Sequence, residues 1–414
     1  MRDNGDVTAA VTAEVTQRRR LTIGPYTVAT PVVLAPMAGI TNQAFRRLCR
    51  EHMAEAGGEG LFVSEMVTSR ALIERNAESM RLIQHDPDEH PRSVQLYGVN
   101  PETVGACVRM LLEEGRADHI DLNFGCPVPK VTRKGGGAAL PWKGQLFGAI
   151  VRQAVTNAAS YGVPITVKMR KGIDPQHLSF IDAGRIAEAE GAASVALHGR
   201  TAADYYAGHA DWDAIAELKQ AVTSIPVLGN GDIWSADDAV LMMRQTGCDG
   251  VVVGRGCLGR PWLFADLAAA MNGDGTRIRP GLDAVVVTIR RHIELLAEHF
   301  SGHERGESGC RPATAMDRAC RDIRKHIAWY LKGYAAGHGA RQALATVESL
   351  DRFDEIVQGL DLAQPYPGEP AEGPRGRAGS PRAVALPAGW LDGPDLGDEA
   401  AAELHAAELA VSGG

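Results

Sequence analysis

One cysteine, Cys126, stands apart from the other six because of the residues around it. It lies in the segment NFGCP at residues 123–127, ahead of a basic stretch that ends in three consecutive glycines, residues 130–137. A thiol in such a turn can act on a substrate over which the loop closes, either as a nucleophile or as a general acid. The residues alone leave both roles open, whereas the other cysteines are expected to be inert and buried.

Three polar side chains, Gln95, Lys168 and His198, stand at the ends of apolar runs that read as strands. A buried lysine is costly unless it faces an anion or an electron-rich ligand. A flavin would explain all three, because its pyrimidine edge needs hydrogen-bonding groups and its reduced ring gathers negative charge that a lysine can stabilise. The alternatives are a hydrogen-bonded core histidine at His198 and an internal ion pair of Lys168 with Glu65 or Asp121.

Two glycine-rich turns follow the last two apolar runs. The first contains Asn230, Gly231 and Asp232, and the second contains Gly254 and Arg255. Small residues let backbone N–H groups approach an anion, and an arginine adds a charge-assisted contact, so the pair predicts a phosphate site. The plainer alternative is that these glycines only make tight turns.

The elements that must position these residues alternate along the chain. Short apolar runs, typical of strands buried on both faces, are separated by amphipathic stretches typical of helices. The strands are expected at residues 32–35, 61–64, 93–96, 119–123, 165–168, 195–198, 227–229 and 250–253. The helices are expected at residues 41–55, 102–114, 142–160, 178–190, 212–222 and 236–246, with N-caps at Thr41 and Ser235 and stops at Gly115, Gly191 and Gly247.

Eight such units predict an α/β fold of the (β/α)8, or TIM, barrel type. A doubly wound sheet is disfavoured, because the GxGxxG motif that often follows its first strand is not found here. Every predicted strand end carries a polar group, a glycine turn or both, which favours an enzyme. We expect a flexible N-terminal segment at residues 1–20, the barrel at 21–271 and a linker at 272–281. A small all-helical domain at 282–360 and a Pro/Gly/Ala-rich acidic tail at 361–414, mostly disordered, would follow.

The helical region carries a basic segment. Residues 311–341 contain seven basic and two acidic residues, although the whole chain has a formal net charge of −8. An apolar stripe at helical spacing would pack inward, at Met316, Cys320, Ile323, Ile327, Tyr330 and Tyr334. The opposite face, with Arg318, Arg321, Lys325, Lys332 and Trp329, fits contacts with a phosphate backbone or, alternatively, is a solvated helix surface.

Composition excludes several classes of protein. Apolar residues make up 45% of the 414 residues and charged residues 23%, which is ordinary for a globular protein. No apolar run approaches the roughly 18 residues that a membrane span needs. No cysteine pair has zinc-ligand spacing, so we expect no metal. The thiols and the lack of a targeting signal predict a cytoplasmic protein.

Taken together, the motifs resemble the tRNA-dihydrouridine synthases, and among them the bacterial B-type branch. The resemblance covers residues 21–360. It rests on APMAGIT at 35–41, QLYG at 95–98, NFGCP at 123–127, KV at 130–131, HGRT at 198–201, NGDI at 230–233, GRG at 254–256, RPW at 260–262, RKHI at 324–327 and WY at 329–330.

The resemblance implies an FMN-dependent barrel followed by a helical RNA-binding domain. Such an enzyme reduces the C5–C6 double bond of particular uridines in the D-loop of tRNA, with NADPH recharging the flavin. Cys126 would be the general acid that protonates C5. Pro36, Met37 and Ala38 would line the flavin ring, Gln95 and Lys168 would hold its pyrimidine edge with His198 beside them, and Asn230, Gly231, Asp232, Gly254 and Arg255 would surround its phosphate.

The resemblance also implies residues that meet the substrate. Asn123, Arg170 and Arg200 would contact the uracil or the RNA near it, and Arg321, Arg324 and Lys325 would bind tRNA. Two features depart from the family pattern, namely the three consecutive glycines at 135–137 and the acidic tail. The tail, with nine acidic residues against three arginines, accounts for −6 of the net charge of −8.

Two other functions remain open at this point. One is a flavin barrel reductase that acts on a small pyrimidine or enone without RNA, and the other is an RNA-binding protein built on a barrel that has lost its activity. The sequence leaves open which uridine is reduced, whether NADPH is preferred over NADH, and the role of the tail. It also leaves open the oligomeric state, with nothing that speaks against a monomer.

Overall fold

A computed structural model describes residues 20–301, 314–376, 378–396 and 404. The chain starts with a two-stranded antiparallel hairpin, β1 (Leu21–Ile23) and β2 (Tyr26–Val28). Leu21, Ile23 and Val28 are buried in one cluster with inward-facing residues of the barrel strands, so the hairpin closes the N-terminal end of the barrel. This hairpin was not predicted, and the expected flexible segment at 1–20 lies outside the described residues except for residue 20.

Eight parallel strands close into a barrel, which confirms the predicted (β/α)8 fold. Each strand pairs with the next along the chain, and the last pairs with the first. Most strands are buried on both faces, as their continuous apolar character predicts. The strands are β3 (Val32–Leu34), β4 (Leu61–Thr68), β5 (Ser93–Tyr97), β6 (His119–Phe124), β7 (Ile165–Arg170), β8 (Ser194–His198), β9 (Val227–Asn230) and β10 (Gly250–Val253).

The six predicted helices agree with helices of the structure to within two residues at each end. The first helix is capped by Asn42 rather than by Thr41. Two short helices between β4 and β5, a short helix after β6 and the helix after β10 were missed. Ser235 caps its helix as predicted, and Gly247 ends it in a left-handed conformation. The helices of the barrel are α2 (Gln43–Glu55), α3 (Ser69–Ile73), α4 (Ala77–Leu82), α5 (Pro101–Glu113), α6 (Pro129–Thr132), α7 (Gly144–Ala158), α8 (Phe180–Ala189), α9 (Asp213–Ala221), α10 (Ala236–Thr246) and α11 (Leu263–Met271). Short 3-10 turns are η1 (Gly137–Trp142), η2 (Ala159–Tyr161) and η3 (Arg255–Cys257).

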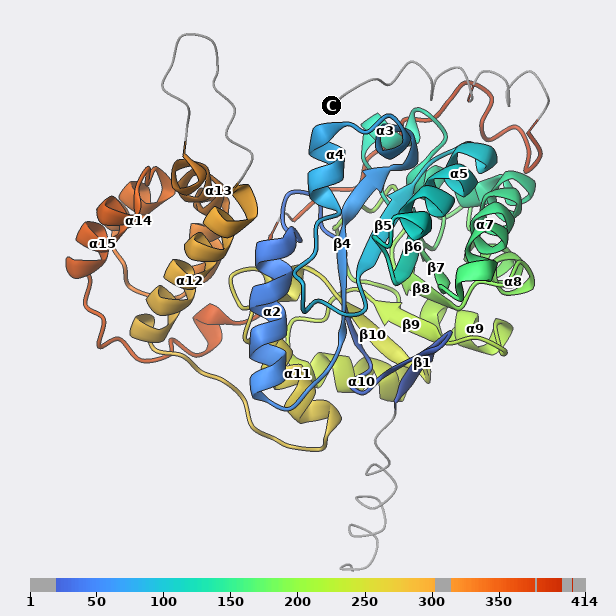
Figure 1. The fold of residues 1–414 in the computed structure, drawn as a ribbon. Coiled ribbons are helices and arrows are strands. Elements are labelled where there is room, and N and C mark those ends of the chain that lie inside the picture. Colours follow the sequence, from blue (N-terminus) through green and yellow to red (C-terminus); the bar gives the residue numbers. More distant parts are fainter. Residues whose placement is uncertain (1–19, 302–313, 377, 397–403, 405–414) are drawn as a thin grey trace, which may run out of the picture.

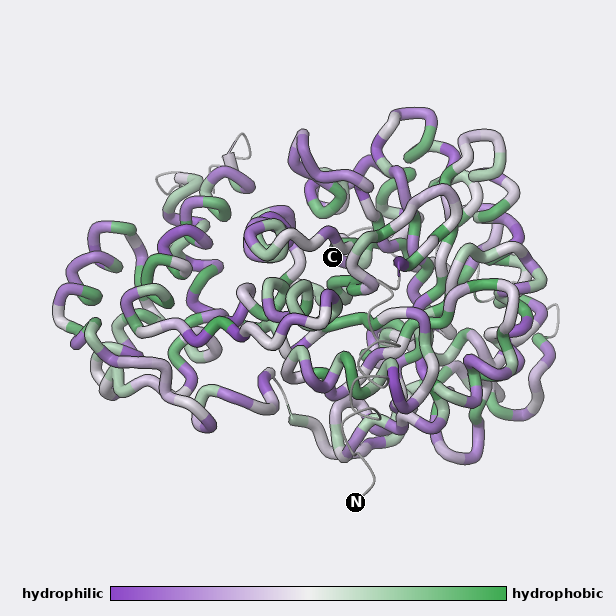
Figure 2. Tube along the Cα trace, turned by 90° about the horizontal axis from the view of Figure 1, so that it is seen from below, coloured by the Kyte–Doolittle hydropathy of each residue, from purple (hydrophilic) through white to green (hydrophobic). Residues whose placement is uncertain are grey.

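A helical lobe lies beside the barrel, and Figure 2 shows the two lobes side by side, with helices whose colour alternates along their length as in amphipathic helices. It contains α12 (Leu282–Phe300), α13 (Ala315–Tyr330), α14 (His338–Ala345) and α15 (Leu350–Gln358), followed by the 3-10 turn η4 (Glu369–Ala371). Ala44 and Leu48 of α2 belong to the same apolar cluster as the buried faces of α12 and α13. The helical lobe is therefore packed on the barrel through α2.

The C-terminal segment departs from the expected disorder. Residues 361–376 and 378–396 run from the helical lobe along the end of the barrel opposite the β1 hairpin, as the red trace in Figure 1 shows. Trp390 is only 3% exposed and is buried in one cluster with Ala139 and Ile173 of the barrel. The expectation of a mostly disordered tail does not hold for these residues, because scattered apolar side chains find a surface despite the Pro/Gly-rich composition.

Within the described residues, no helix is both long and apolar enough to span a membrane. In the same part of the chain, no group of three His, Cys, Asp or Glu side chains could hold a metal ion.

Candidate active site

Cys126 lies directly after β6, at the end of the barrel where the predicted site residues meet. The side-chain oxygen of Asn123 accepts hydrogen bonds from the backbone N–H groups of Gly125 at 3.1 Å and of Cys126 at 3.0 Å. The carbonyl of Cys126 accepts from the N–H of Ala138 at 3.0 Å. At Gly137, whose φ is +56°, a Cβ would lie 2.4 Å from that carbonyl oxygen. The chain therefore folds back on Cys126 so closely that only glycine fits.

The surroundings of the thiol keep it protonated. Burial raises the pKa of Cys126 above its usual value of 9.0, and a backbone hydrogen bond from Val128 together with the charges of Arg170 and Lys168 counteracts this in part. The residue remains partly exposed, so a substrate can reach it. A neutral thiol at neutral pH is suited to donate a proton rather than to attack as a thiolate.

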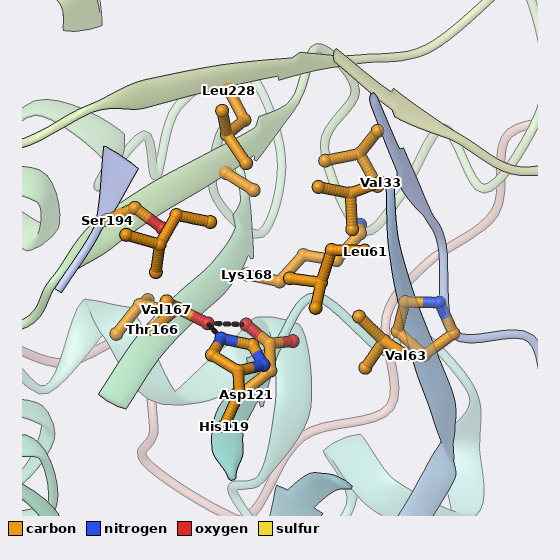
Figure 3. Close-up of a pocket in the computed structure, with 14 residues that line it drawn as sticks. Val33, Leu61, Val63, His119, Asp121, Thr166, Val167, Lys168, Ser194 and Leu228 are labelled. Carbon is orange, nitrogen blue, oxygen red and sulfur yellow. Dashed lines mark hydrogen bonds between the residues drawn. The ribbon is translucent and has the colours of Figure 1, made fainter. Parts of the chain in front are cut away.

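A chain of buried hydrogen bonds connects Asn123 to the barrel interior. The Asn123 amide donates to Gln95 Oε1 at 2.8 Å, and Gln95 Nε2 donates to Asp121 Oδ2 at 2.7 Å. Thr166 Oγ1 donates to Asp121 Oδ1 at 2.6 Å, and His119 Nε2 lies 2.9 Å from Thr166 Oγ1. Figure 3 shows Asp121, Thr166 and His119 beside a small cavity of about 20 Å³. Lys168 also lines this cavity. Gln95 thus has a fixed orientation at the strand end.

Lys168 does not form the salt bridge with Glu65 or Asp121 considered as an alternative. Its Nζ donates instead to Asn230 Oδ1 at 3.0 Å, and Asn230 Nδ2 donates to the carbonyl of Val252 at 2.6 Å. Burial and the charge of Arg170 lower the pKa of Lys168 from 10.5 to about 8. The lysine is therefore an incompletely neutralised cation held across β7, β9 and β10.

His198 lies among four cationic side chains. Burial and the charges of Arg170, Lys168, Arg200 and Arg255 lower its pKa well below 6.5. The imidazole is therefore neutral at neutral pH. A concentration of positive charge in a largely buried site favours an anionic ligand, such as a phosphate group.

Arg200 is committed to the scaffold of this site. It is 2% exposed, and its guanidinium donates to both carboxylate oxygens of Asp232 at 2.8 and 2.9 Å. It also donates to the carbonyls of Ala207 and Gly208. We expected Arg200 to contact the substrate, but these bonds favour support of Asp232 and of the loop after β8.

Arg170 is also committed to backbone carbonyls. It is 3% exposed and donates to Gly125 at 2.9 Å, to Thr201 at 2.8 Å and to Tyr205 at 2.9 Å. It therefore ties the turn that contains Cys126 to the loop after β8. This favours a role in holding Cys126 in place over the predicted direct contact with RNA.

Arg255 lies close to two aromatic rings, which were not singled out from the sequence. Its guanidinium carbon is 4.3 Å from the ring centre of Tyr206 and 4.9 Å from that of Trp234. A terminal nitrogen lies 3.7 Å from Asp232, which also binds Arg200. Aromatic residues shortly after HGRT and NGDI were the available signal, because arginine stacks readily on aromatic faces.

The glycines predicted to surround a phosphate differ in their surroundings. Gly231 has φ +122°, and a Cβ there would lie 2.5 Å from Ala210 and 3.1 Å from the His198 ring. Gly254 is less crowded, with the nearest atoms to a Cβ being those of Ala35 at 3.5 Å and Met37 at 3.8 Å. Gly231 therefore allows the close packing of the β9 turn, and Gly254 lies beside the turn after β3.

The turn after β3 holds Pro36 and Met37 half-buried and Ala38 exposed. Thr41 Oγ1 accepts from the N–H of Met37 at 2.9 Å. The N–H of Gly39, in the same turn, donates to the buried carboxyl group of Glu65. The sequence had suggested Glu65 only as a partner of Lys168. Burial raises the pKa of Glu65, while the Gly39 hydrogen bond and the charge of Lys325 oppose this.

The effect of Lys325 on Glu65 indicates that α13 lies near the site. Arg321 and Lys325 are exposed on α13, and Lys325 Nζ is 2.8 Å from Asp322. Arg324 donates to the carbonyls of Val347 at 2.7 Å and Thr346 at 2.9 Å. Of the three predicted tRNA contacts, two are therefore exposed, whereas Arg324 fastens α13 to the segment before α15.

Two other members of the predicted basic face are occupied within the protein. Arg318 lies over the ring of Phe300 at 4.8 Å. Lys332 donates to the carbonyls of Glu372 and Pro374 in the C-terminal segment. The basic face is therefore smaller than the sequence suggested.

Comparisons with known proteins identify the family of this chain. A family model described as "Dihydrouridine synthase (Dus)" matches residues 33–364, so all but the first four residues of the C-terminal segment lie outside the match. A solved structure of histamine dehydrogenase from Rhizobium sp. 4-9 is similar over 68% of this chain and 51% of its own, with 12% identity and a TM-score of 0.45, too distant to inform on activity.

Curated relatives are much more similar. A "Probable tRNA-dihydrouridine synthase" of Mycobacterium tuberculosis (strain CDC 1551 / Oshkosh) is 58% identical over 91% of this chain and 93% of its own. The "Probable tRNA-dihydrouridine synthase" of Mycobacterium leprae is 54% identical over 88% of this chain and 96% of its own. The "tRNA-dihydrouridine synthase B" of Pseudomonas syringae pv. tomato is 40% identical over 80% of this chain and 90% of its own. The chain belongs to the dihydrouridine synthase family.

Proposed function

We propose that this protein reduces the C5–C6 double bond of uridines in the D-loop of tRNA, with Cys126 as the general acid. The observation that carries the proposal is the position of Cys126, in a turn that Asn123 and Arg170 hold beside a cation-lined site, in a chain of this family. In the reaction, Cys126 Sγ gives its proton to C5. The charges of Lys168 and Arg170, which already act on this thiol, stabilise the thiolate that remains until solvent reprotonates it.

The residues of the site fit FMN. The neutral His198, the fixed Gln95 amide and the excess of positive charge suit a ring with polar edges and an attached phosphate. Gln95 and Lys168 would hold the pyrimidine edge, while Asn230, Gly231, Asp232, Gly254 and Arg255 would surround the phosphate and Pro36, Met37 and Ala38 the ring. When bound, FMN supplies the hydride for C6 of the uracil and receives its electrons from NADPH.

Two exposed cations on α13, Arg321 and Lys325, would contact the tRNA backbone. The target uridine must leave its stack to reach Cys126, and contacts elsewhere on the RNA help to meet that cost. Lys325 acts electrostatically on Glu65, beside the turn after β3, so an RNA bound there would lie close to the mouth of the barrel.

The test uses the purified full-length protein, unmodified tRNA transcript and NADPH. We expect dihydrouridine in the tRNA by mass spectrometry, with consumption of NADPH and a yellow protein. A yellow protein that oxidises NADPH with a small pyrimidine or enone but leaves tRNA unmodified would contradict the proposal. A colourless protein that binds tRNA without modifying it would contradict it as well.

A further inference from the structure

The C-terminal segment, residues 361–376 and 378–396, is called the strap below. Its first part joins the barrel to the helical lobe. Arg375 is 6% exposed and donates to the carbonyl of Trp329 at the end of α13, at 2.6 Å, and to that of Leu258 in the barrel, at 3.3 Å. Glu372 forms an ion pair with Arg260 at 2.9 Å. The start of the strap is therefore anchored on both lobes.

The strap next follows the loop after β8. The N–H of Arg382 donates to the carbonyl of Ala203 at 3.0 Å, and its guanidinium carbon lies 3.7 Å from the ring centre of Tyr205. Because the carbonyl of Tyr205 also accepts from Arg170, the strap is fastened to a loop of the candidate active site.

The end of the strap is fixed on the loop that follows Cys126. The indole Nε1 of Trp390 donates to the carbonyl of Ala139 at 3.1 Å. Lys143 Nζ donates to the strap carbonyls of Gly393 at 2.5 Å and Asp395 at 2.9 Å, and it lies 5.3 Å from the centre of the Trp390 ring. A buried indole with its N–H satisfied is a strong and specific anchor.

Two of the three consecutive glycines, Gly135 and Gly137, are accounted for by this contact and by Cys126. At Gly135, whose φ is +67°, a Cβ would lie 2.5 Å from a carbon of the Trp390 ring. Gly137, two residues on, has no room for a Cβ because of the Cys126 carbonyl. Trp390 thus contacts the loop on both sides of the turn at Gly137 and Ala138 that holds Cys126, namely at Gly135 and at Ala139.

We propose that Trp390 is a positioning residue, through which the strap holds the Cys126 loop in its working geometry. A run of three glycines gives a loop large conformational freedom, which disfavours a fixed placement of the thiol. The Trp390 contact removes that freedom, and it needs a residue without Cβ at position 135. Most of the strap, from residue 365 on, lies outside the part of the chain that the family model matches, whereas the glycine run lies inside it. The inference rests on the proposed function only in naming Cys126 as the acid.

The first test measures the accessibility of the thiol, independently of any RNA. The full-length, flavin-loaded protein is treated with iodoacetamide, and alkylation of Cys126 and of the buried Cys107 is followed by peptide mass spectrometry. We expect Trp390→Ala to raise the rate at Cys126 several-fold and to leave Cys107 unchanged. Trp390→Phe keeps most of the ring contact but loses the bond to Ala139, so its rate should fall between those of the wild type and Trp390→Ala.

The glycine offers a matched pair of variants. Gly135→Ala and Gly162→Ala introduce a Cβ at nearly the same left-handed φ, +67° and +66°, but only Gly135 faces Trp390, and nothing lies within 4 Å of a Cβ at Gly162. We expect Gly135→Ala to behave like Trp390→Ala and Gly162→Ala to behave like the wild type. In the double variant Gly135→Ala/Trp390→Ala the effects should be less than additive.

The second test separates the two half-reactions. We expect Trp390→Ala to slow single-turnover oxidation of the reduced protein by tRNA several-fold, and to leave reduction by NADPH unchanged. Unchanged alkylation of Cys126 in Trp390→Ala and in Gly135→Ala would overturn the inference. Faster turnover of tRNA in Trp390→Ala would also overturn it, and would identify the strap as a barrier to the substrate. Full activity of Cys126→Ala would overturn the acid role but not the alkylation result, so the two failures are distinguishable.

Discussion

The side-chain amide of Gln95 donates to Asp121 at 2.7 Å inside the barrel, and both residues are buried. Because Gln95 Oε1 accepts from Asn123, the amide has one defined orientation, with its nitrogen toward Asp121 and its oxygen toward Asn123. The carboxylate in the barrel interior therefore determines which hydrogen-bonding group of Gln95 is available to a ligand at the strand end.

Replacing Asp121 by Asn should weaken flavin binding. An amide at this position cannot accept from both Thr166 and Gln95 with the strength of a carboxylate, and it removes the negative charge that raises the pKa of Lys168. A lost charge-assisted hydrogen bond costs about 1.5–3 kcal/mol, roughly a ten- to hundredfold weaker affinity.

Fluorescence titration of the flavin-free protein with FMN measures the affinity of the Asp121→Asn variant. Thr166→Val is the matched control, since it removes the hydrogen bonds to Asp121 and His119 without changing the charge. An affinity in Asp121→Asn no lower than in Thr166→Val would contradict the role of the carboxylate.

Replacing Lys168 by Met should alter how stability depends on pH in the flavin-free protein. The pKa of Lys168 is lowered from 10.5 to about 8, so below about pH 8 the lysine is charged in both states and the folded protein bears the full cost of burying the cation. Between these two values the unfolded chain binds more protons, so the wild type gains stability as pH rises. Removing the buried cation should raise the free energy of unfolding below pH 8 by on the order of 3 kcal/mol. The lost hydrogen bond to Asn230 should lower it by only about 1 kcal/mol.

Denaturation at a series of pH values checks this prediction. We expect the variant to be more stable than the wild type near pH 7, and the difference to shrink as the pH rises toward 10. A stability difference that does not change with pH would show that Lys168 titrates normally. The same variant should have lost its affinity for FMN.

The pH dependence of single-turnover oxidation by tRNA should distinguish the two roles that the residues alone left open for Cys126. The pKa of the thiol is raised above 9.0, and that of His198 lies well below 6.5. A general acid is then fully protonated between about pH 6 and 7.5, so the rate should be nearly constant in that range. A thiolate nucleophile would instead give a rate that rises about tenfold per pH unit. Stopped-flow absorbance of the flavin measures the rate.

The basic residues of α13 should divide into two classes. Arg321→Gln removes an exposed charge and should weaken tRNA binding moderately, with a smaller dependence of the affinity on salt concentration. Arg324→Gln removes bonds to the carbonyls of Thr346 and Val347, and should lower the thermal stability of the protein. Filter binding at several salt concentrations, together with melting curves, separates the two. An Arg321→Gln variant with unchanged affinity and salt dependence would exclude this surface as a tRNA contact.

Much of this architecture could be predicted from the sequence, because buried parallel strands leave continuous apolar runs and strand ends carry the polar residues. The eight strands were located in this way, as was the helical region. The β1 hairpin was missed because two three-residue strands leave no periodicity. The predicted cap of the first barrel helix was wrong by one residue, because Thr41 and Asn42 are adjacent and both can cap a helix. Asn42 is the cap, and the hydroxyl of Thr41 bonds to Met37 instead.

The roles of the arginines could not be read from the sequence. Arg170 and Arg200 stand at strand ends beside the predicted site, but their guanidinium groups bind carbonyls and a carboxylate that only the folded chain brings together. The strap was misjudged for a similar reason. Its composition resembles that of disordered segments, whereas its placement depends on single contacts, such as that of Trp390 with Gly135, between residues far apart in the sequence.

The most direct test of the account maps dihydrouridine in tRNA from cells that lack this gene, complemented with the wild type or with Cys126→Ala. We predict that dihydrouridine is lost at a defined D-loop position, that the wild type restores it, and that Cys126→Ala does not. Full restoration by Cys126→Ala would contradict the role of the thiol as the acid. A dihydrouridine pattern unchanged by the deletion, together with no dihydrouridine formed by the purified protein, would contradict the proposed reaction itself.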